Sequence, residues 1–212
     1  MKTTILLLSM ILLSTAAHGQ DLQPIKLSAP DKAGGKPLMK ALAERKSSRE
    51  FADGDIKPQD LSTLLWAANG INRPDGKRTA PSAMDRRDVD VYVITPAGAY
   101  LYDPADHALN PVAKGDFRNF IASGQDFAAT APVSLLLVSD LTKFSPAPND
   151  GTKITGAIDI GIVSQNISLA CASLELATVP RGTMNQAELK KVLNLKDTHL
   201  LGLNHPVGLL KK

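Results

Sequence analysis

The chain has 212 residues, a formal net charge of +3 at pH 7 and one cysteine, Cys171. So small a positive charge gives no reason to expect a nucleic acid or an anionic membrane as a partner, and a lone cysteine excludes an intramolecular disulfide. The length suits one domain with a substantial hydrophobic core.

Residues 1–19 are predicted to be a secretory signal peptide. Lys2 precedes an apolar run at residues 5–13, and small residues follow, which is the layout of such peptides. Cleavage is expected after Gly19, with Ala17 as the alternative position. The apolar run is shorter than the roughly 20 residues that a transmembrane helix needs. We therefore expect export across the inner membrane to the periplasm, and no stable membrane association of the mature chain.

The rest of the chain is predicted to form an extended arm and one domain of alternating helices and strands. Residues 20–36, rich in Pro, Gly, Lys and Asp, form the arm, and the domain spans residues 37–212. Pro58 suits the first turn of the second helix, and Gly70 suits its end. In chain order, the expected elements are a helix at 38–44, a helix at 59–69, a basic loop at 71–88, strands at 89–95 and 99–102, one or two helices within 117–129, a strand covered on both faces at 132–139, and a loop at 140–153.

The longest helical pattern covers residues 154–177. Apolar side chains recur at three- and four-residue spacing on two sides of it, and small residues fill much of the remainder. A helix of this kind is buried on most sides, so we expect it to be the central core helix, a subunit interface, or both. After it come an extended piece at 178–180, a helix at 186–193 capped by Asn185 with Glu188 three residues on, and a last strand at 198–203.

Common catalytic and nucleotide-binding motifs are absent from the sequence. It has no G-x-G-x-x-G turn, no G-x-x-x-x-G-K-[ST] loop, no G-x-S-x-G elbow and no H-E-x-x-H. His107, His199 and His205 lie apart, so a metal site is not expected, and the last two are expected to satisfy local hydrogen bonds near the last strand. Cys171 is interpreted as a buried small hydrophobe rather than a reactive thiol. Asp159, near the predicted start of the long helix, is interpreted as complementing the helix dipole rather than as a catalytic carboxylate.

A cluster of cations and hydroxyl groups follows the first helix. Arg45, Lys46 and Arg49 surround Ser47 and Ser48. Guanidinium and hydroxyl donors suit the oxygens of a phosphate group, but cations at a helix C-terminus can also merely complement the helix dipole. The cluster by itself favours the helix-end interpretation. Segments 81–84 and 179–184 and the terminal pair Lys211-Lys212 have compositions that would also suit binding.

Taken in order, several segments resemble the FMN-dependent nitroreductase family. The similarity extends over about residues 37–212, and it makes phosphate binding the favoured role for the cation cluster. Residues 45–51 are similar to the family's R-R-S-x-R-x-F signature, 61–72 to L-x-x-L-L-W-A-A-x-G-x-N, 81–83 to the P-S-A-G flavin loop with Met84 replacing the glycine, 125–132 to Q-x-F…A-P-V, 159–170 to D-x-G-x-x-x-Q-N-x-x-L-A, and 201–208 to L-G-x-P-x-G with Asn204-His205 where one residue is usual.

The resemblance implies an α+β nitroreductase-like fold, with a central and mostly antiparallel sheet flanked by helices, in an intertwined homodimer that binds FMN. It implies roles for particular residues of this chain. Arg45 and Ser47 would hold the FMN phosphate, with backbone or charge from Lys46 and help from Lys211 or Lys212. Arg49 would lie toward the pyrimidine edge of the flavin. The flavin ring would be lined on one side by Pro81, Ser82 and Ala83 of the partner subunit, with Met84 narrowing access to the ring, and on its other side by Val179, Pro180, Arg181 and Gly182.

The implied activity is the transfer of two electrons, as hydride, between a donor and a small organic acceptor such as a nitroaromatic or a quinone. The chemistry would take place on the flavin, so no catalytic side chain is expected. Because the protein is expected to be exported, its electron donor could be NAD(P)H or another reductant. Electrons could also flow in the opposite direction, from a substrate through the flavin to an external acceptor, as in the family's oxidative members. A non-catalytic flavin- or ligand-binding protein and a structural dimer without flavin are the alternatives.

Overall fold

The computed structural model describes residues 22–211, so the predicted signal peptide lies outside the described residues. Helices are α1 (Leu38–Glu44), α2 (Pro58–Asn69), α3 (Arg118–Ala122), α4 (Phe127–Thr130), α5 (Asp150–Ser173) and α6 (Gln186–Val192), with short 3₁₀ helices at Ala83–Asp85 and Leu141–Lys143. Strands are β1 (Ile25–Lys26), β2 (Phe51–Ala52), β3 (Val89–Ile94), β4 (Gly98–Asp103), β5 (Ala108–Lys114), β6 (Val133–Asp140), β7 (Leu176–Thr178) and β8 (His199–Leu210).

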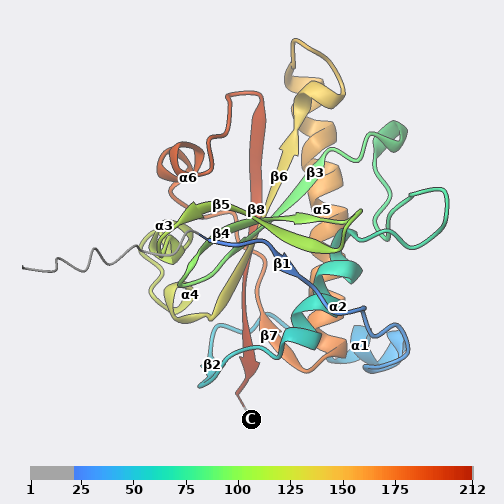
Figure 1. Ribbon diagram of the computed structural model, residues 1–212, viewed down its shortest axis with the longest axis vertical. Coiled ribbons are helices and arrows are strands. Elements are labelled where there is room, and N and C mark those ends of the chain that lie inside the picture. The colour runs from blue at the N-terminus through green and yellow to red at the C-terminus, as the bar shows by residue number, and fades with distance from the viewer. Residues whose placement is uncertain (1–21, 212) are drawn as a thin grey trace, which may run out of the picture.

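The strands form one sheet in the order β1-β5-β4-β3-β6-β8-β2, and β7 pairs with β8 beside this path. Every strand pair in the described part of the chain is antiparallel. The predicted α+β class, with a mostly antiparallel sheet flanked by helices, is thereby confirmed (Figure 1).

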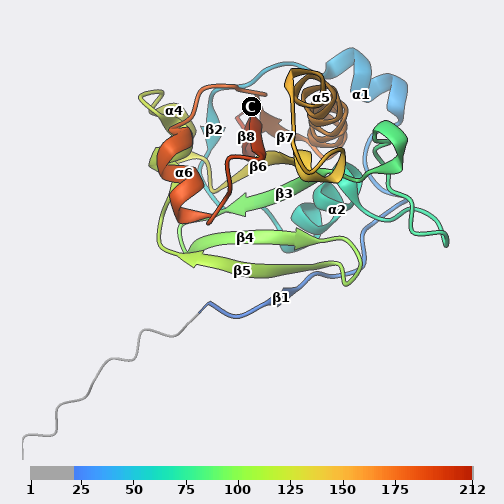
Figure 2. The same ribbon diagram turned by 90° about the horizontal axis from the view of Figure 1, so that it is seen from above.

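Helices cover both faces of this sheet because its central strands are apolar on both sides. Successive side chains of a strand point to opposite faces, and β3 and β6 divide their residues accordingly. Val91 and Leu135 pack into a core with α2 and α5, whereas Tyr92 and Leu136 pack into a second core with α3 and α6. Seen from above, α1, α2 and α5 gather on one side and α3, α4 and α6 on the other (Figure 2).

Helix α5 begins and ends about four residues earlier than the sequence pattern predicts. Its start is fixed by a capping box, in which Asn149 Oδ1 accepts the Thr152 N–H at 3.0 Å and Thr152 Oγ1 accepts the Asn149 N–H at 2.8 Å. Its end is followed by Glu175 at φ 58°, which turns the chain into β7. By length and composition α5 could cross a membrane, but core helices share those properties, and here it packs on the sheet.

Strand β8 is longer than predicted. The sequence suggests a strand at 198–203 and a closing loop, but the strand runs from His199 to Leu210. It continues because backbone partners lie along both of its edges: Val133 of β6 pairs with Val207, and β7 and β2 pair with the last residues of the strand. Pairing with distant strands is not visible in a local sequence pattern, and it keeps Asn204, His205 and Pro206 extended.

The segment before α1 wraps around the domain. β1 pairs with the edge strand β5, and the chain then crosses α2, where the Asp31 N–H donates to Thr63 Oγ1 at 3.0 Å. The Lys36 N–H donates to the carbonyl of Ser173 at 3.0 Å, at the end of α5. These bonds bring Lys36 and α1 to the C-terminal end of α5.

Replacing Asn149 by Ala should lower the free energy of unfolding by about 1 kcal/mol, because the first turn of α5 loses its side-chain acceptor. Urea denaturation followed by circular dichroism would measure the change. Asn149→Asp keeps an acceptor and is the matched control, with stability close to that of the unmodified protein. Equal losses in the two variants would contradict the capping role.

Candidate functional site

Three segments that are distant in the sequence meet at one end of the sheet. The Ser48 N–H donates to the Thr178 carbonyl at 2.9 Å, which joins the cation cluster to β7. β2 then pairs with β8, with Phe51 opposite Leu210. Figure 1 shows β2, β7 and the C-terminus together at this end. The backbone therefore carries the predicted phosphate-binding residues to the end of β8 and to Lys211.

Most of the cation cluster lines an open cavity of about 380 Å³, although Arg45 is not part of its wall. Lys46, Ser47 and Arg49 contribute to its wall from one side and Lys211 from the other. Lys211 also forms an ion pair with Glu50, with Nζ and Oε2 3.2 Å apart; both side chains are exposed, so this pair is weak. The structure thus brings together four of the residues that the sequence assigned to the FMN phosphate and its surroundings.

The cations of this cluster are available to a ligand. Arg45 directly follows α1 and donates its backbone N–H to the carbonyl of Ala41 at 2.8 Å. Among the described residues, no hydrogen bond or ion pair engages the side chain of Arg45, Lys46 or Arg49, and all three are exposed. Adjacent cations without a protein partner repel one another, so an anion between them would relieve the repulsion. The arrangement fits a phosphate group better than a passive helix end.

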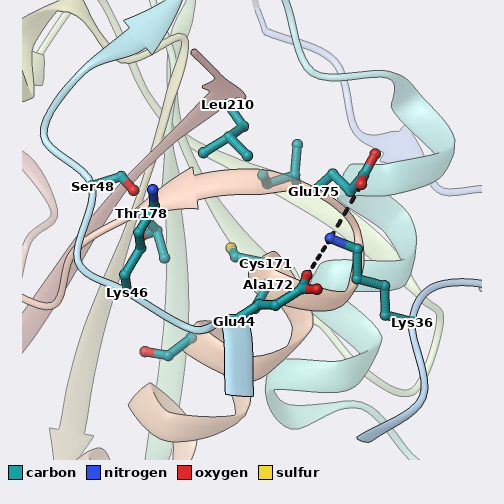
Figure 3. Close-up of a pocket in the computed structure, with 11 residues that line it drawn as sticks. Lys36, Glu44, Lys46, Ser48, Cys171, Ala172, Glu175, Thr178 and Leu210 are labelled. Carbon is teal, nitrogen blue, oxygen red and sulfur yellow. Dashed lines mark hydrogen bonds and ion pairs between the residues drawn. The ribbon is translucent and has the colours of Figure 1, made fainter. Parts of the chain in front are cut away.

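A smaller cavity of about 290 Å³ lies on the other side of this segment (Figure 3). At the edge of this cavity, Lys36 Nζ forms ion pairs with Glu44 at 2.7 Å and with Glu175 at 3.1 Å. The hydrogen bonds with these carboxylates raise the pKa of Lys36. Lys36 is therefore already engaged, unlike Lys46 across the cavity. Cys171 lies at the floor, where burial raises the pKa of its thiol far above the usual range. The predicted burial of Cys171 is confirmed, and its raised pKa agrees with the interpretation as a small hydrophobe rather than a reactive thiol.

Arg181 has a structural role that the sequence does not reveal. Its backbone N–H and C=O pair with those of Asn204, both at 2.8 Å, and its side chain is buried. Burial, and then the charge of Arg49, lowers its pKa. Its guanidinium donates to Gln125 Oε1, to Asn204 Oδ1 and to the carbonyls of Ile121 and Ala122, at 2.9–3.1 Å. The side chain thus ties the segment after β7 to α3 and β8, and within residues 179–182 the exposed Pro180 and Gly182 remain available to line a ligand.

Within one chain the structure does not bring Pro81, Ser82 and Ala83 to the cation cluster. The Ala83 N–H donates to Asp159 Oδ2 at 2.9 Å, and Asp159 precedes Cys171 by twelve helical residues, or about 18 Å along α5. Figure 1 shows the loop beside the middle of α5 and the cluster near its lower end. Within one chain the two parts therefore lie at different places along α5.

Asp159 is not near the start of its helix, so the dipole interpretation is wrong. The helix begins at Asp150, which makes Asp159 its tenth residue, and the carboxyl is buried. It instead accepts the Ala83 N–H and lies against Asp88. Sequence reasoning missed Asp88; its only local signal is an acidic residue immediately before a largely apolar strand. Met84, in the same loop, adopts a left-handed conformation at φ 53° and is 70% exposed.

The histidines behave differently from one another. His199 Nδ1 accepts the Lys196 N–H at 3.2 Å, the local bond that was expected. His205 is fully buried and instead has distant partners, with Nε2 2.7 Å from Ser164 Oγ and Nδ1 3.4 Å from Thr178 Oγ1. Burial lowers the pKa of His205 to about 3, so it is neutral at physiological pH. In residues 22–211, no group of histidine, cysteine or acidic side chains could hold a metal ion.

Comparison with known proteins gives a consistent result. The family model described as the nitroreductase family matches residues 42–209. A solved structure of a candidate nitroreductase from Ralstonia eutropha JMP134 is 37% identical, covers 89% of this chain and 90% of its own, and superposes with a TM-score of 0.82. A curated candidate nitroreductase of Methanocaldococcus jannaschii is 28% identical over 81% of this chain and 90% of its own length.

More distant structures share the fold alone. An NADPH:FMN oxidoreductase from Vibrio harveyi, solved in complex with NAD⁺, is 20% identical and covers 82% of this chain and 69% of its own, with a TM-score of 0.63.

Arg181→Ala should lower the free energy of unfolding by about 3 kcal/mol, because four acceptors, three of them in buried hydrogen bonds, lose their donor. Arg73→Ala removes an exposed arginine whose ion pair with Asp75 is weak, so it should change stability by less than about 0.5 kcal/mol. Urea titration of both variants tests the difference. A small effect at Arg181 would mean that its side chain is free for another role.

Proposed function

The chain belongs to the nitroreductase family, and from that membership we propose that it is an FMN-dependent oxidoreductase. When bound, FMN supplies the two-electron chemistry, with a small organic acceptor such as a nitroaromatic or a quinone as the proposed substrate. The single observation that carries the proposal is the exposed, unpaired cation cluster of Arg45, Lys46 and Arg49 beside Ser47.

The cluster supports phosphate binding by charge and by donor geometry. Arg45 and Ser47 would hold the phosphate, since guanidinium and hydroxyl donors match phosphate oxygens. Lys46 adds charge from the wall of the same cavity, and Lys211 faces it from the end of β8. Because the hydrogen bond from Ser48 to Thr178 fixes the path of this segment, the donors are held by the sheet rather than by a free loop.

Arg49 would act on the redox properties of the cofactor. We place it toward the pyrimidine edge of the flavin, where negative charge develops on reduction and a nearby cation stabilises it. The buried Arg181 is close enough for the two charges to interact, which adds positive potential in the same direction. Val179, Pro180 and Gly182 would pass along the ring through their backbone.

We also propose that the functional unit is a homodimer. Large apolar side chains are exposed on α1 and α5, including Leu38, Met39, Ile154 and Ile158, and such a surface is a common mark of a protein interface. The Pro81–Ala83 loop lies far from the cation cluster of its own chain. A partner that supplies this loop would complete the flavin site at the interface.

The electron donor is proposed to reach the flavin outside the cytoplasm, because residues 1–19 have the pattern of a signal peptide. NAD(P)H is one proposed donor and another periplasmic reductant is the other. Rapid mixing of the flavin-loaded protein with NADPH separates them, since bleaching of the visible flavin absorbance identifies a nicotinamide donor. A protein that binds FMN but is not bleached by a nicotinamide, and whose chemically reduced flavin is reoxidised by a nitroaromatic or a quinone no faster than free reduced FMN, would be a non-catalytic binder.

Arg45→Ala should weaken FMN binding by about ten- to a hundredfold, because one charge-assisted phosphate contact is lost. Arg49→Ala should instead shift the flavin reduction potential to a more negative value with a smaller loss of affinity. Fluorescence titration and a redox titration measure the two quantities.

The matched control is Lys196→Ala, which removes one exposed cation from the turn after α6. It should leave both the FMN affinity and the potential unchanged. If Arg45→Ala and Arg49→Ala also leave both unchanged, the cluster is a solvated helix end and the proposed site is wrong.

Ile158→Glu should convert the dimer into monomers at micromolar concentration and reduce FMN binding at the same time, because a buried charge would oppose the interface. Light scattering coupled to size exclusion reports the mass. Val112→Glu alters an exposed apolar residue on β5 instead and should leave the mass unchanged. An unmodified protein that runs as a monomer would refute the dimer.

A further inference from the structure

Two carboxyl groups are buried together behind the Pro81–Ala83 loop. Asp88 has no exposed surface and Asp159 is 2% exposed, and the two carboxyl groups are close enough for Asp159 to raise the pKa of Asp88. Two negative charges in contact inside a protein are strongly disfavoured, so such a pair retains one proton.

The hydrogen bonds around the pair indicate where that proton lies. Ser139 Oγ donates to Asp88 Oδ2, and the Ala83 N–H donates to Asp159 Oδ2 at 2.9 Å. Asp88 Oδ1 is buried and, among the described residues, has no hydrogen-bond partner. An unpaired buried carboxylate oxygen is costly. A proton on Asp88 Oδ1, donated to the Asp159 carboxylate, removes that cost.

The loop in front of the pair is strained and needs support. Met84, Asp85 and Arg87 all adopt left-handed conformations, at φ 53°, 53° and 52°, which are unfavourable for residues with a side chain. Most of its hydrogen bonds are local: the Arg87 N–H donates to Ser82 Oγ at 2.8 Å, and the N–H groups of Asp85 and Arg86 donate to the carbonyls of Ser82 and Ala83, both at 3.1 Å. Two bonds connect the loop to other elements, one from Lys143 Nζ to the Arg87 carbonyl and one from the Ala83 N–H to Asp159. The bond from Ala83 to Asp159 is the one that fixes the loop to α5.

We propose that Asp88 and Asp159 share one proton and that this carboxyl–carboxylate hydrogen bond positions the Pro81–Ala83 loop. Asp159 is then a positioning residue, held in place by Asp88, which Ser139 orients in turn. The consequence for flavin binding rests on the proposed function, because it assumes that this loop lines the flavin of the partner subunit.

The proposal gives the loop a dependence on pH. Burial raises the pKa of Asp88 to about 6, the Ser139 hydrogen bond opposes the rise, and Asp159 adds to it. Because the folded pKa is raised, the shared proton is present below about pH 6 and is lost as the pH rises through that value. Two charges then face each other, Asp159 is displaced, and the loop loses its anchor.

Other charged groups near the pair already have partners or belong to other networks. Arg87 pairs with Asp85 at 2.9 Å, Lys143 Nζ donates to the Arg87 carbonyl, and Lys153 pairs with Asp150. The remaining charged or titratable groups on the packed elements are Asp60 on α2, Arg73, Asp75, Lys77, Arg78 and Arg86 in the loop, Asp90 and Tyr92 on β3, Asp140 on β6, Cys171 on α5, and His199 and His205 on β8. The largest influences on the pKa of Asp88 are burial, Ser139 and Asp159 rather than any of these.

Hydrogen exchange of the Ala83 amide tests the proposal on the mature, full-length protein without any need for flavin. After correction for the intrinsic pH dependence of exchange, protection of the amide should fall about tenfold between pH 5 and pH 7.5, as one hydrogen bond to a charged group is lost. Asp88→Asn keeps a donor toward Asp159 but cannot titrate, so its protection should be high and constant across this range.

Asp159→Ala should lose the protection at every pH, and circular dichroism would establish that this variant is folded. Asp140→Asn, on the neighbouring strand, is the control and should show the same pH dependence as the unmodified protein. Constant protection in the unmodified protein, or loss of protection in Asp88→Asn, would overturn the shared proton.

A parallel FMN titration over the same pH range separates this proposal from the proposed function. A weakening of FMN binding that follows the loss of protection, and that is absent in Asp88→Asn, supports both. Failure to bind FMN at any pH would refute the flavin site, while the exchange data would still decide whether the proton is shared.

Discussion

The continuous antiparallel pairing of β8 is the constraint on which the rest of the structure depends. This strand pairs with β6 and then β2 along one edge and with β7 along the other, so three distant segments take their positions from a single backbone. The cation cluster reaches the site because β2 and Ser48 follow this pairing. Buried side chains of β8 extend the same connection, since Asn204 bonds Arg181 and His205 lies against Ser164 of α5.

Helix α5 separates the two halves of the candidate site. Its C-terminal end lies under the cation cluster, and its middle holds the Pro81–Ala83 loop through Asp159. A straight helix cannot bring its middle and its end to one ligand, because each residue adds about 1.5 Å to the distance. The separation gives a physical reason for pairing two chains, in which each would supply the half that the other lacks.

Burial divides the charged residues into two groups with different tasks. Arg181, Asp88 and Asp159 are buried and hydrogen-bonded, and they hold strands, helices and a strained loop in place. Arg45, Lys46 and Arg49 are exposed, and within the part of the chain that the structure describes their side chains have no hydrogen bond or ion pair. Buried charges are retained only with partners, so the residues left over for a ligand are those at the surface.

The sequence by itself determined the local elements and the order of the family motifs. Helical sequence patterns, with Pro58 and Gly70 at the two ends of α2, located α1 and α2 closely, and the continuous apolar run at 132–139 predicted a strand covered on both faces. The start of α5, the length of β8 and the task of Arg181 were decided only by the tertiary structure. Each depends on a partner far away in the chain or on a capping bond that apolar periodicity does not register. Arg45 and Arg181 are both arginines beside a turn, and only the fold shows that one is exposed and unpaired while the other is buried among four acceptors.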